Sequence, residues 1–323
     1  MTDSFEERAF ALARVTEAAA LASISFAGRR DGDAADRAAA RAIRGALASF
    51  GARVRTVIGE GEKDGVEHVA AGEVFGLGDA RVDLALDPID GTTRLSTGRR
   101  GSVSAAAIAP EGGFFDPGPS HYMTKVVCSA RAGAHVDPNA PAADIVRAVA
   151  RGLDKAVTDV NVFVLDKARH VELIKEILGT GARVQVEDAG DLEGAVLAAL
   201  PDSGIDVLLG TGGSPEGVVS ACAVRALGGF FYGRLAPQRA PEEEKLRALG
   251  LFPGPFLPLE RLVPSTSTVF ALTGITDGAL TRGVTATPRS TQGGATPGSL
   301  ETETLVVWGP RQGLAWLRRR HPA

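Results

Sequence analysis

Two carboxylates stand close together at the end of an apolar segment. Residues 82–93 read VDLALDPIDGTT, so Asp87 ends an expected strand and Asp90 follows after a stiff proline. Acids gathered in this way repel one another unless a cation neutralises them, and all-oxygen ligand sets suit Mg²⁺ or Mn²⁺. Gly91 lets the backbone approach a ligand, and Thr92 offers a hydroxyl and an N–H group to a metal-bound phosphate. The plainer alternative is an Asx-type turn with a threonine cap.

Two more expected strands end in acids and glycines. The segment TVIGEGEKD places Glu60, Glu62 and Asp64 in one loop, and QVEDAGD ends a later strand in the same way. Ligands of open α/β sheets bind at the carboxyl ends of the strands, so we expect these loops to gather around a metal. Asp36 stands in the first turn of an expected helix. The alternatives are a solvated acidic turn and, for Asp36, an interaction with the helix dipole.

A third kind of loop suits phosphate. In LLGTGGSPEGVV an expected strand is followed by three glycines and a helix, with Ser214 as N-cap and Pro215 in the first turn. The backbone N–H groups at such a helix start form a cradle for anions. Glu216 adds a carboxylate and makes the same place a candidate metal site. A structural strand-to-helix turn is the alternative.

Three further residues suit contacts with a phosphorylated sugar. Arg169 and His170 stand together in KARH, at an expected strand-to-helix turn, where they could hold a phosphate. Tyr122 follows a loop rich in proline and glycine and suits a sugar contact. The alternatives are a surface pair at the start of a helix and an aromatic anchor in the core. The five histidines show no HxH or HExxH spacing, so they do not indicate a histidine metal site.

Helices and strands alternate to position these loops. Alanine-rich segments free of proline predict helices at 6–27 and 34–50, and apolar runs predict strands at 54–58 and 82–87. Residues 101–119 alternate and then turn at PEGG, which predicts a β-hairpin.

The second half of the chain follows a simpler pattern. Three strand–helix units in succession imply a largely parallel sheet. We therefore expect an N-terminal metal-binding α+β half at 1–150 and a C-terminal α/β half with substrate loops at 151–323. The final strands could return to the first half.

Composition argues against several classes of protein. The chain has 323 residues, a net charge of −4 and a pI of about 5.8, so it lacks the basic bias typical of nucleic-acid binding. We expect WLRRRHPA to be the basic end of a C-terminal helix. Cys128 and Cys222 are expected to be buried and indicate neither a zinc site nor disulfides. With no apolar run near about 18 residues and no signal-peptide pattern, we expect a cytoplasmic protein without a membrane span.

An ordered series of motifs resembles a known family. The segments VIGEGE, DPIDGT, YMTK, KARH, GGSPEGVVSA and ALTGITDG occur in this order. They resemble the bacterial class II fructose-1,6-bisphosphatases, which belong to the lithium-sensitive, metal-dependent sugar phosphatases. The likeness runs from VTEAAALAS to TGITDG and covers most of the chain, which makes it far more specific than any single loop.

The resemblance implies a layered α/β/α/β/α sandwich, an α/β fold, in a homodimeric or homotetrameric phosphatase with two or more Mg²⁺ or Mn²⁺ ions per active site. The positions that match the family's metal ligands are Asp36, Glu60, Asp87, Asp90 and Glu216. The positions that match the family's residues for orienting the attacking water are Thr92, Asp64 and Glu62. The positions that match substrate contacts are Asp90, Gly91, Thr92, Tyr122, Arg169, His170, Asp188, Asp191 and Gly213.

The substrate implied is fructose 1,6-bisphosphate, with sedoheptulose 1,7-bisphosphate next, in carbohydrate metabolism and gluconeogenesis. Three positions depart from the family pattern. Asp90 stands where the family usually has glutamate, Gly32 stands near a usual lysine, and DAGD replaces Asp-Gly-Asp, which shifts Asp188 but keeps Asp191. Two alternatives follow, a phosphatase for another polyol or cyclitol phosphate and a non-catalytic sensor of sugar phosphates.

Overall fold

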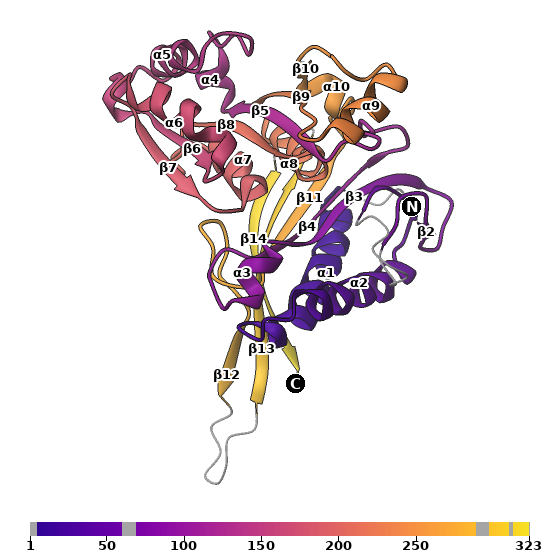
Figure 1. The fold of residues 1–323 in the computed structure, drawn as a ribbon. Coiled ribbons are helices and arrows are strands. Elements are labelled where there is room, and N and C mark those ends of the chain that lie inside the picture. The colour runs from indigo at the N-terminus through magenta and orange to yellow at the C-terminus, as the bar shows by residue number, and fades with distance from the viewer. Residues whose placement is uncertain (1–4, 60–68, 289–296, 310–312, 323) are drawn as a thin grey trace. The chain divides into compact units, whose positions relative to one another are not determined.

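The computed structural model describes residues 5–59, 69–288, 297–309 and 313–322 (Figure 1). The chain forms two compact units, here called unit 1 (residues 1–111 and 267–323) and unit 2 (residues 112–266). The α/β class is confirmed, because each unit contains a mixed sheet with helices packed on it. The bounds of the units differ from the expected division at residue 150, which falls inside a helix of unit 2.

Unit 1 is built on an eight-stranded sheet. The strand order is β12-β13-β11-β4-β3-β1-β2, with β14 paired to β13. Only β1 and β3 pair in parallel among the described ladders of this sheet. The strands are β1 (Arg53–Ile58), β2 (Val74–Phe75), β3 (Arg81–Asp90), β4 (Val103–Pro110), β11 (Val269–Gly274), β12 (Thr285–Pro288), β13 (Pro297–Trp308) and β14 (Gly313–Pro322). The last four strands of the chain thus join the sheet that begins near the N-terminus.

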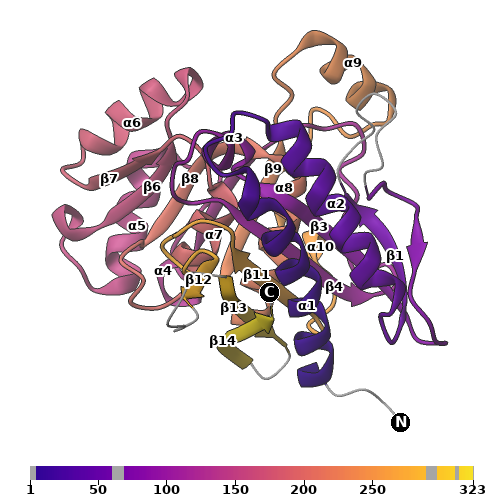
Figure 2. The same cartoon turned by 90° about the horizontal axis from the view of Figure 1, so that it is seen from below.

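Two long helices cover this sheet. Helix α1 (Phe5–Ser23), extended by the 3-10 turn η1 (Ile24–Phe26), packs against β4, β11 and β13, and α2 (Gly32–Ala48) lies beside α1. Figure 2 shows the two helices side by side. Alanines fill much of their buried faces, and this allows the backbones to approach closely.

One helical segment passes a length and composition test for a membrane span. Phe5–Phe26 is long and apolar enough by this test, and half of its most apolar window is buried within the described structure. Its buried face carries Glu17 and Thr16 as well as apolar residues. The Thr16 hydroxyl lies 2.7 Å from that of Thr273 in the sheet. Helices buried in a protein core meet the same test, so this finding alone is weak evidence for a membrane.

Two sequence expectations for unit 1 are wrong. The chain does not form a hairpin after β4, because β4 pairs with β3 and β11 and the chain then enters unit 2 at Gly112. The basic C-terminal segment is a strand and not a helix. Strand β14 alternates half-buried and exposed side chains, and Arg318, Arg319 and Arg320 pair with glutamates. Opposite charges across neighbouring elements therefore favour the extended form.

Unit 2 contains a six-stranded sheet in the order β10-β9-β5-β8-β6-β7. Its strands are β5 (Tyr122–Cys128), β6 (Asn161–Leu165), β7 (Arg183–Glu187), β8 (Val207–Gly213), β9 (Phe230–Leu235) and β10 (Leu257–Pro258). The three predicted strand–helix units are present, and β6 pairs in parallel with β7 and β8. The other ladders are antiparallel, so the sheet is mixed and less parallel than expected.

Helices lie on both faces of the sheet of unit 2. They are α4 (Ala130–Gly133), α5 (Ala142–Leu153), α6 (Val171–Leu178), α7 (Asp191–Ala199), α8 (Ser214–Leu227), α9 (Ala240–Ala248) and α10 (Leu259–Leu262). Alternation along β5 separates the two faces: Val126 and Cys128 pack with α5 and α6, whereas Lys125 reaches α7 and α8. Both cysteines are buried, as expected, and burial raises the pKa of the Cys128 thiol.

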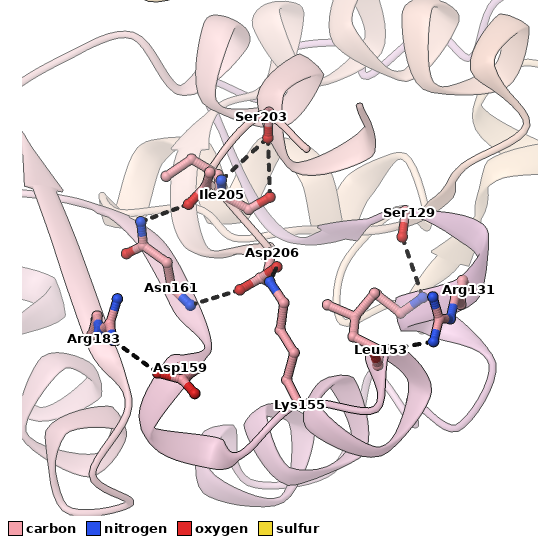
Figure 3. A network of polar contacts seen from close by, with 12 residues as sticks. Ser129, Arg131, Leu153, Lys155, Asp159, Asn161, Arg183, Ser203, Ile205 and Asp206 are labelled. Atoms are coloured by element: carbon pink, nitrogen blue, oxygen red, sulfur yellow. Dashed lines mark hydrogen bonds and ion pairs between the residues drawn. The ribbon is translucent and has the colours of Figure 1, made fainter. Parts of the chain in front are cut away.

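A polar network fastens the amino ends of the parallel strands (Figure 3). Asp206, before β8, accepts a hydrogen bond from Asn161 N–H at 2.9 Å and an ion pair from Lys155 at 2.6 Å. Arg183 at the start of β7 pairs with Asp159 at 2.8 Å. The amino ends are thereby held by charge-assisted bonds, and the predicted site residues of unit 2 lie at or beyond the opposite ends of β6, β7 and β8.

Candidate active site

A bulge in β3 brings the two central carboxylates to one side. Asp87 lies opposite Ala105 of β4 and Asp90 opposite Val103, so one extra residue is inserted on β3 between the two pairs. Side chains three positions apart point to opposite faces of a regular strand, and one extra residue cancels that difference. Asp87 Oδ1 also accepts the Ile89 N–H at 3.1 Å. The Asx-type turn therefore forms, and it holds one carboxylate in a fixed orientation.

The next residues connect this bulge to α3 (Thr92–Ser96) and α2. Gly91 has φ +88°, a left-handed conformation that glycine adopts without strain, and its carbonyl accepts the Ser102 hydroxyl at 2.8 Å. The Thr92 hydroxyl lies 3.0 Å from Asp36 Oδ1 and 3.1 Å from the Ile89 carbonyl. It has one proton to donate to these two acceptors, so the contacts fix the position of Thr92 Oγ1 beside a buried acid.

Gly32 has a local explanation. A Cβ at this position would lie 2.9 Å from Thr92 Cγ2, which is closer than real side chains approach. The first turn of α2, which directly precedes Asp36, can therefore pack closely against Thr92. A lysine here, as the family pattern has, would require Thr92 to move.

Some of the predicted residues lie outside the described part of the chain. These are Glu60, Glu62 and Asp64. Among the residues that the structure does describe, no group of three His, Cys, Asp or Glu side chains is close enough to hold a metal ion. Asp36, Asp87, Asp90, Gly91 and Thr92 belong to unit 1, and the other predicted residues with described positions belong to unit 2. Their roles as ligands remain predictions.

Two acids of unit 2, Asp191 and Glu216, interact with a fully buried lysine that was not predicted from the sequence. Lys125 is 0% exposed and its Nζ forms an ion pair with Asp191 Oδ2. Asp191 begins α7 directly after Gly190, which has φ +84°. Its carboxylate lies over Gly212, where a Cβ would fall 2.6 Å from Asp191 Cγ. The signal for Lys125 was a charged residue inside the otherwise apolar run KVVC.

Glu216 has the features of a cation ligand. Its Oε2 atom is buried without a hydrogen-bond partner in the described part of the chain. Burial and the charge of Asp191 raise the pKa of Glu216, while Lys125 lowers it. The carboxylate folds back over Gly213, where a Cβ would lie 2.6 Å from Oε1. A buried acid with an unsatisfied oxygen fits a divalent metal ion, because such an ion would compensate for the lost solvation.

His170 is held by the backbone through both ring nitrogens. Nδ1 lies 2.7 Å from the Leu165 carbonyl, and Nε2 accepts the Thr211 N–H at 2.8 Å. These partners require a neutral ring that carries its proton on Nδ1. Burial is the main cause that lowers the pKa of His170, and the positive charge of Arg169 lowers it further. His170 thus fastens the turn after β6 to β8.

Arg169 and Tyr122 form a stacked pair. The guanidinium carbon lies 5.0 Å from the centre of the Tyr122 ring. Nε and Nη2 of Arg169 both donate to the Thr211 carbonyl, at 3.0 and 2.7 Å. Asp188 lies before α7, and its carbonyl accepts Lys167 Nζ at 2.7 Å. These predicted substrate residues are therefore ordered by contacts within unit 2.

The α/β fold, the carboxylates at strand ends and the glycine-rich start of α8 are features of proteins that bind phosphate groups. The sequence model of the family of bacterial, glpX-encoded fructose-1,6-bisphosphatases matches residues 6–307. A Haemophilus influenzae protein named fructose-1,6-bisphosphatase class 2 is 37% identical, over 97% of this chain and 95% of its own length. Fructose-1,6-bisphosphatase 1 class 2 of Escherichia coli K12 is 37% identical, over 98% and 97%. The chain belongs to the bacterial class 2 fructose-1,6-bisphosphatase family, which confirms the predicted resemblance.

Proposed function

We propose that the protein is a phosphoric monoester hydrolase that converts fructose 1,6-bisphosphate to fructose 6-phosphate and phosphate. The substrate is proposed from family membership over nearly the whole chain and from the names of its relatives. The observation that best supports the chemistry is the bulge in β3, which turns Asp87 and Asp90 to one side just before Thr92.

The proposed ligands are Asp36, Glu60, Asp87 and Asp90 of unit 1 and Glu216 of unit 2. The orphaned, buried Oε2 of Glu216 supports this role. Bound Mg²⁺ or Mn²⁺ would supply electrostatic stabilisation of the phosphate oxygens and a water of lowered pKa. We propose two or more ions per active site.

The chain's own residues would position the reactants. The Thr92 hydroxyl, placed by Asp36 and the Ile89 carbonyl, would hold the attacking water, assisted by Glu62 and Asp64. The backbone at Gly91 and the start of α8 after Gly213 would bind phosphate oxygens with N–H groups. Tyr122, Arg169, His170, Asp188 and Asp191 would contact the rest of the substrate, with His170 acting through the backbone that it holds.

The test is phosphate release from fructose 1,6-bisphosphate with added Mg²⁺ or Mn²⁺ and after chelation. We expect release that requires metal and falls by about 10²-fold or more in Asp87→Asn, since a metal ligand is lost. Asp79→Asn, a change of an exposed acid before β3, is the control and should keep its activity. Near-normal, metal-supported release by Asp87→Asn would refute the site assignment.

A substrate panel separates the alternatives. Asp90 and the DAGD segment depart from the family pattern, and these departures favour another polyol or cyclitol phosphate as the second candidate. Sedoheptulose 1,7-bisphosphate and an inositol monophosphate therefore belong in the panel. Faster release from the inositol phosphate would favour the second candidate, and binding without release from any compound would favour a sensor.

We also propose a cytoplasmic location, a role in gluconeogenesis, and a homodimer or homotetramer that binds neither nucleic acid nor membrane. The acidic net charge of −4 supports the absence of nucleic-acid binding. Light scattering of the purified protein would give the number of subunits.

A further inference from the structure

Glu242 is a buried acid to which the proposed reaction gives no role. It lies in the first turn of α9 and is only 5% exposed, although Glu244 of the same helix is exposed. Its Oε1 atom accepts the His121 N–H at 2.8 Å, and Oε2 accepts the Gln238 N–H at 3.1 Å. Burial of a carboxylate is costly unless hydrogen bonds replace its water. Both oxygens therefore hold backbone, and one of them holds a segment far away in the sequence.

The bond to His121 completes the end of the β5–β8 ladder. The ladder ends at the pair Tyr122 and Gly213, so the next pair would be His121 and Ser214. Two such residues exchange two backbone bonds in a regular antiparallel sheet. The Ser214 N–H does donate to the His121 carbonyl, at 3.0 Å. Ser214 begins α8, however, so its carbonyl accepts within the helix. The His121 N–H therefore needs another acceptor, and Glu242 supplies it.

This corner of unit 2 connects two predicted site residues. Tyr122 directly follows His121, and Glu216 lies two positions after Ser214 in the first turn of α8. The Ser120 hydroxyl strengthens the connection, since it lies 3.0 Å from the Tyr122 carbonyl and 3.0 Å from the Ser214 hydroxyl. Both serines are buried. A shift of His121 would thus displace the start of β5 and the start of α8 together.

We propose that Glu242 is a positioning residue for the phosphatase reaction. Its carboxylate fixes His121, and through His121 it sets Tyr122 against the substrate and Glu216 against the metal. Helix α9 is a firm base for this contact, because Leu246 anchors it and is 0% exposed. The inference rests on the proposed function, which assigns the roles of Tyr122 and Glu216.

Hydrogen–deuterium exchange of the metal-free full chain tests the positioning without turnover. Glu242→Gln keeps the shape of the side chain, but it has one acceptor oxygen in place of two and no charge. Peptides that contain His121 and Ser214 should exchange about tenfold or more faster, because a hydrogen bond to a charged group is lost. Glu244→Gln, a change of an exposed acid in the same helix, is the matched control and should leave their exchange unchanged.

Two functional measurements separate positioning from a purely structural role. In Glu242→Gln, the KM for fructose 1,6-bisphosphate should rise about tenfold, since Tyr122 is displaced. The affinity for Mn²⁺, measured by electron paramagnetic resonance without substrate, should fall about tenfold, since Glu216 loses its support. Ser120→Ala removes the second connection between Tyr122 and α8, so it should change both constants in the same direction.

A lower unfolding midpoint for Glu242→Gln, with wild-type KM and Mn²⁺ affinity, would show a structural role only and would overturn the proposal. Unchanged exchange at His121 and Ser214 would also overturn it. If Glu242→Gln does not fold, Ser120→Ala decides through the same two constants. Failure of the wild-type protein to release phosphate would count against the proposed function alone. Faster exchange and weaker Mn²⁺ binding in Glu242→Gln than in Glu244→Gln would then still support the positioning role.

Discussion

Replacement of Lys125 by methionine should destabilise unit 2 strongly. Lys125 is 0% exposed and pairs with Asp191, and its charge also lowers the pKa of Glu216. Without Lys125, the carboxylates of Asp191 and Glu216 repel each other in a buried region with little solvent. Removal of one partner from a buried ion pair costs about 3–5 kcal/mol, because the other charge is left uncompensated. At about 2–4 °C per kcal/mol for a unit of this size, the midpoint of thermal unfolding should fall by roughly 6–20 °C.

Thermal unfolding of metal-free protein at neutral pH measures this effect. The double variant Lys125→Met with Asp191→Asn should recover part of the lost stability, since it removes both charges of the pair. Lys155→Met is the matched control, because Lys155 pairs with Asp206 while its own side chain is 43% exposed. That control should change the free energy of unfolding by about 1 kcal/mol or less. A midpoint for Lys125→Met equal to that of the control, or a double variant as unstable as the sum of both single variants, would refute the reasoning.

Three further changes test other contacts. Since burial lowers the pKa of His170 below 6.5, its neutral form contributes stability that is fully present above pH 6.5 and is lost as pH falls below it, and His170→Gln should flatten this part of a urea-midpoint profile. Arg319→Met should lower the free energy of unfolding at neutral pH by about 1–3 kcal/mol, because it leaves the buried Glu17 carboxylate unpaired. Burial raises the pKa of Glu17 above its usual 4.5, so Glu17 becomes neutral before the pH falls to that value, and this loss should shrink as pH falls toward 4.5. Gly91→Ala should cost about 1–3 kcal/mol at φ +88° and reduce phosphate release by shifting Thr92.

Each of these changes has a control in the same chain. His135→Gln alters an exposed histidine, and an equal flattening of the profile there would remove His170 as the cause. Arg320→Met alters an arginine whose side chain is 67% exposed, and a loss as large as that of Arg319→Met would mean that burial of the partner is unimportant. Gly112→Ala shares a positive φ of 77° without a neighbour within 4 Å of the added Cβ. It should be strained but active, and reduced phosphate release there would contradict the role given to Gly91.

The order of helices and strands was predictable where the pattern is local. The alanine-rich helices and the three strand–helix units of unit 2 follow from spacing over a few residues, and they are present. The prediction of a hairpin after β4 was wrong because β4 pairs with β11, a strand that lies far along the chain. The prediction of a C-terminal helix was wrong for a similar reason. The glutamates that pair with the arginines of β14 lie on β13 and α1. Pairing over long sequence distances leaves no local signal.

In the candidate site, too, the contacts of single residues could not be predicted from the local sequence. The sequence indicated that Asp87 and Asp90 lie close together after a stiff proline, whereas only the register of β3 against β4 shows the inserted residue that turns both to one side. His170 was expected to meet phosphate directly, and both its ring nitrogens bond the backbone. Lys125 was missed because a single lysine beside an apolar run is only a weak signal of burial. Its importance is clear only when Asp191 is seen beside it.

The position of unit 2 in the chain has a consequence for biosynthesis. Unit 2 interrupts unit 1 between β4 and β11, so Gly112–Thr266 must leave the ribosome before β11 can reach β4. At about 5–20 residues per second, this delay is on the order of ten seconds or more. During that time the edge of β4 and the apolar face of α1 lack the strands that cover them, while unit 2 is continuous and can complete its own sheet. Nascent chains are thus expected to finish unit 2 first, while apolar surface of unit 1 stays exposed until its last strands are made.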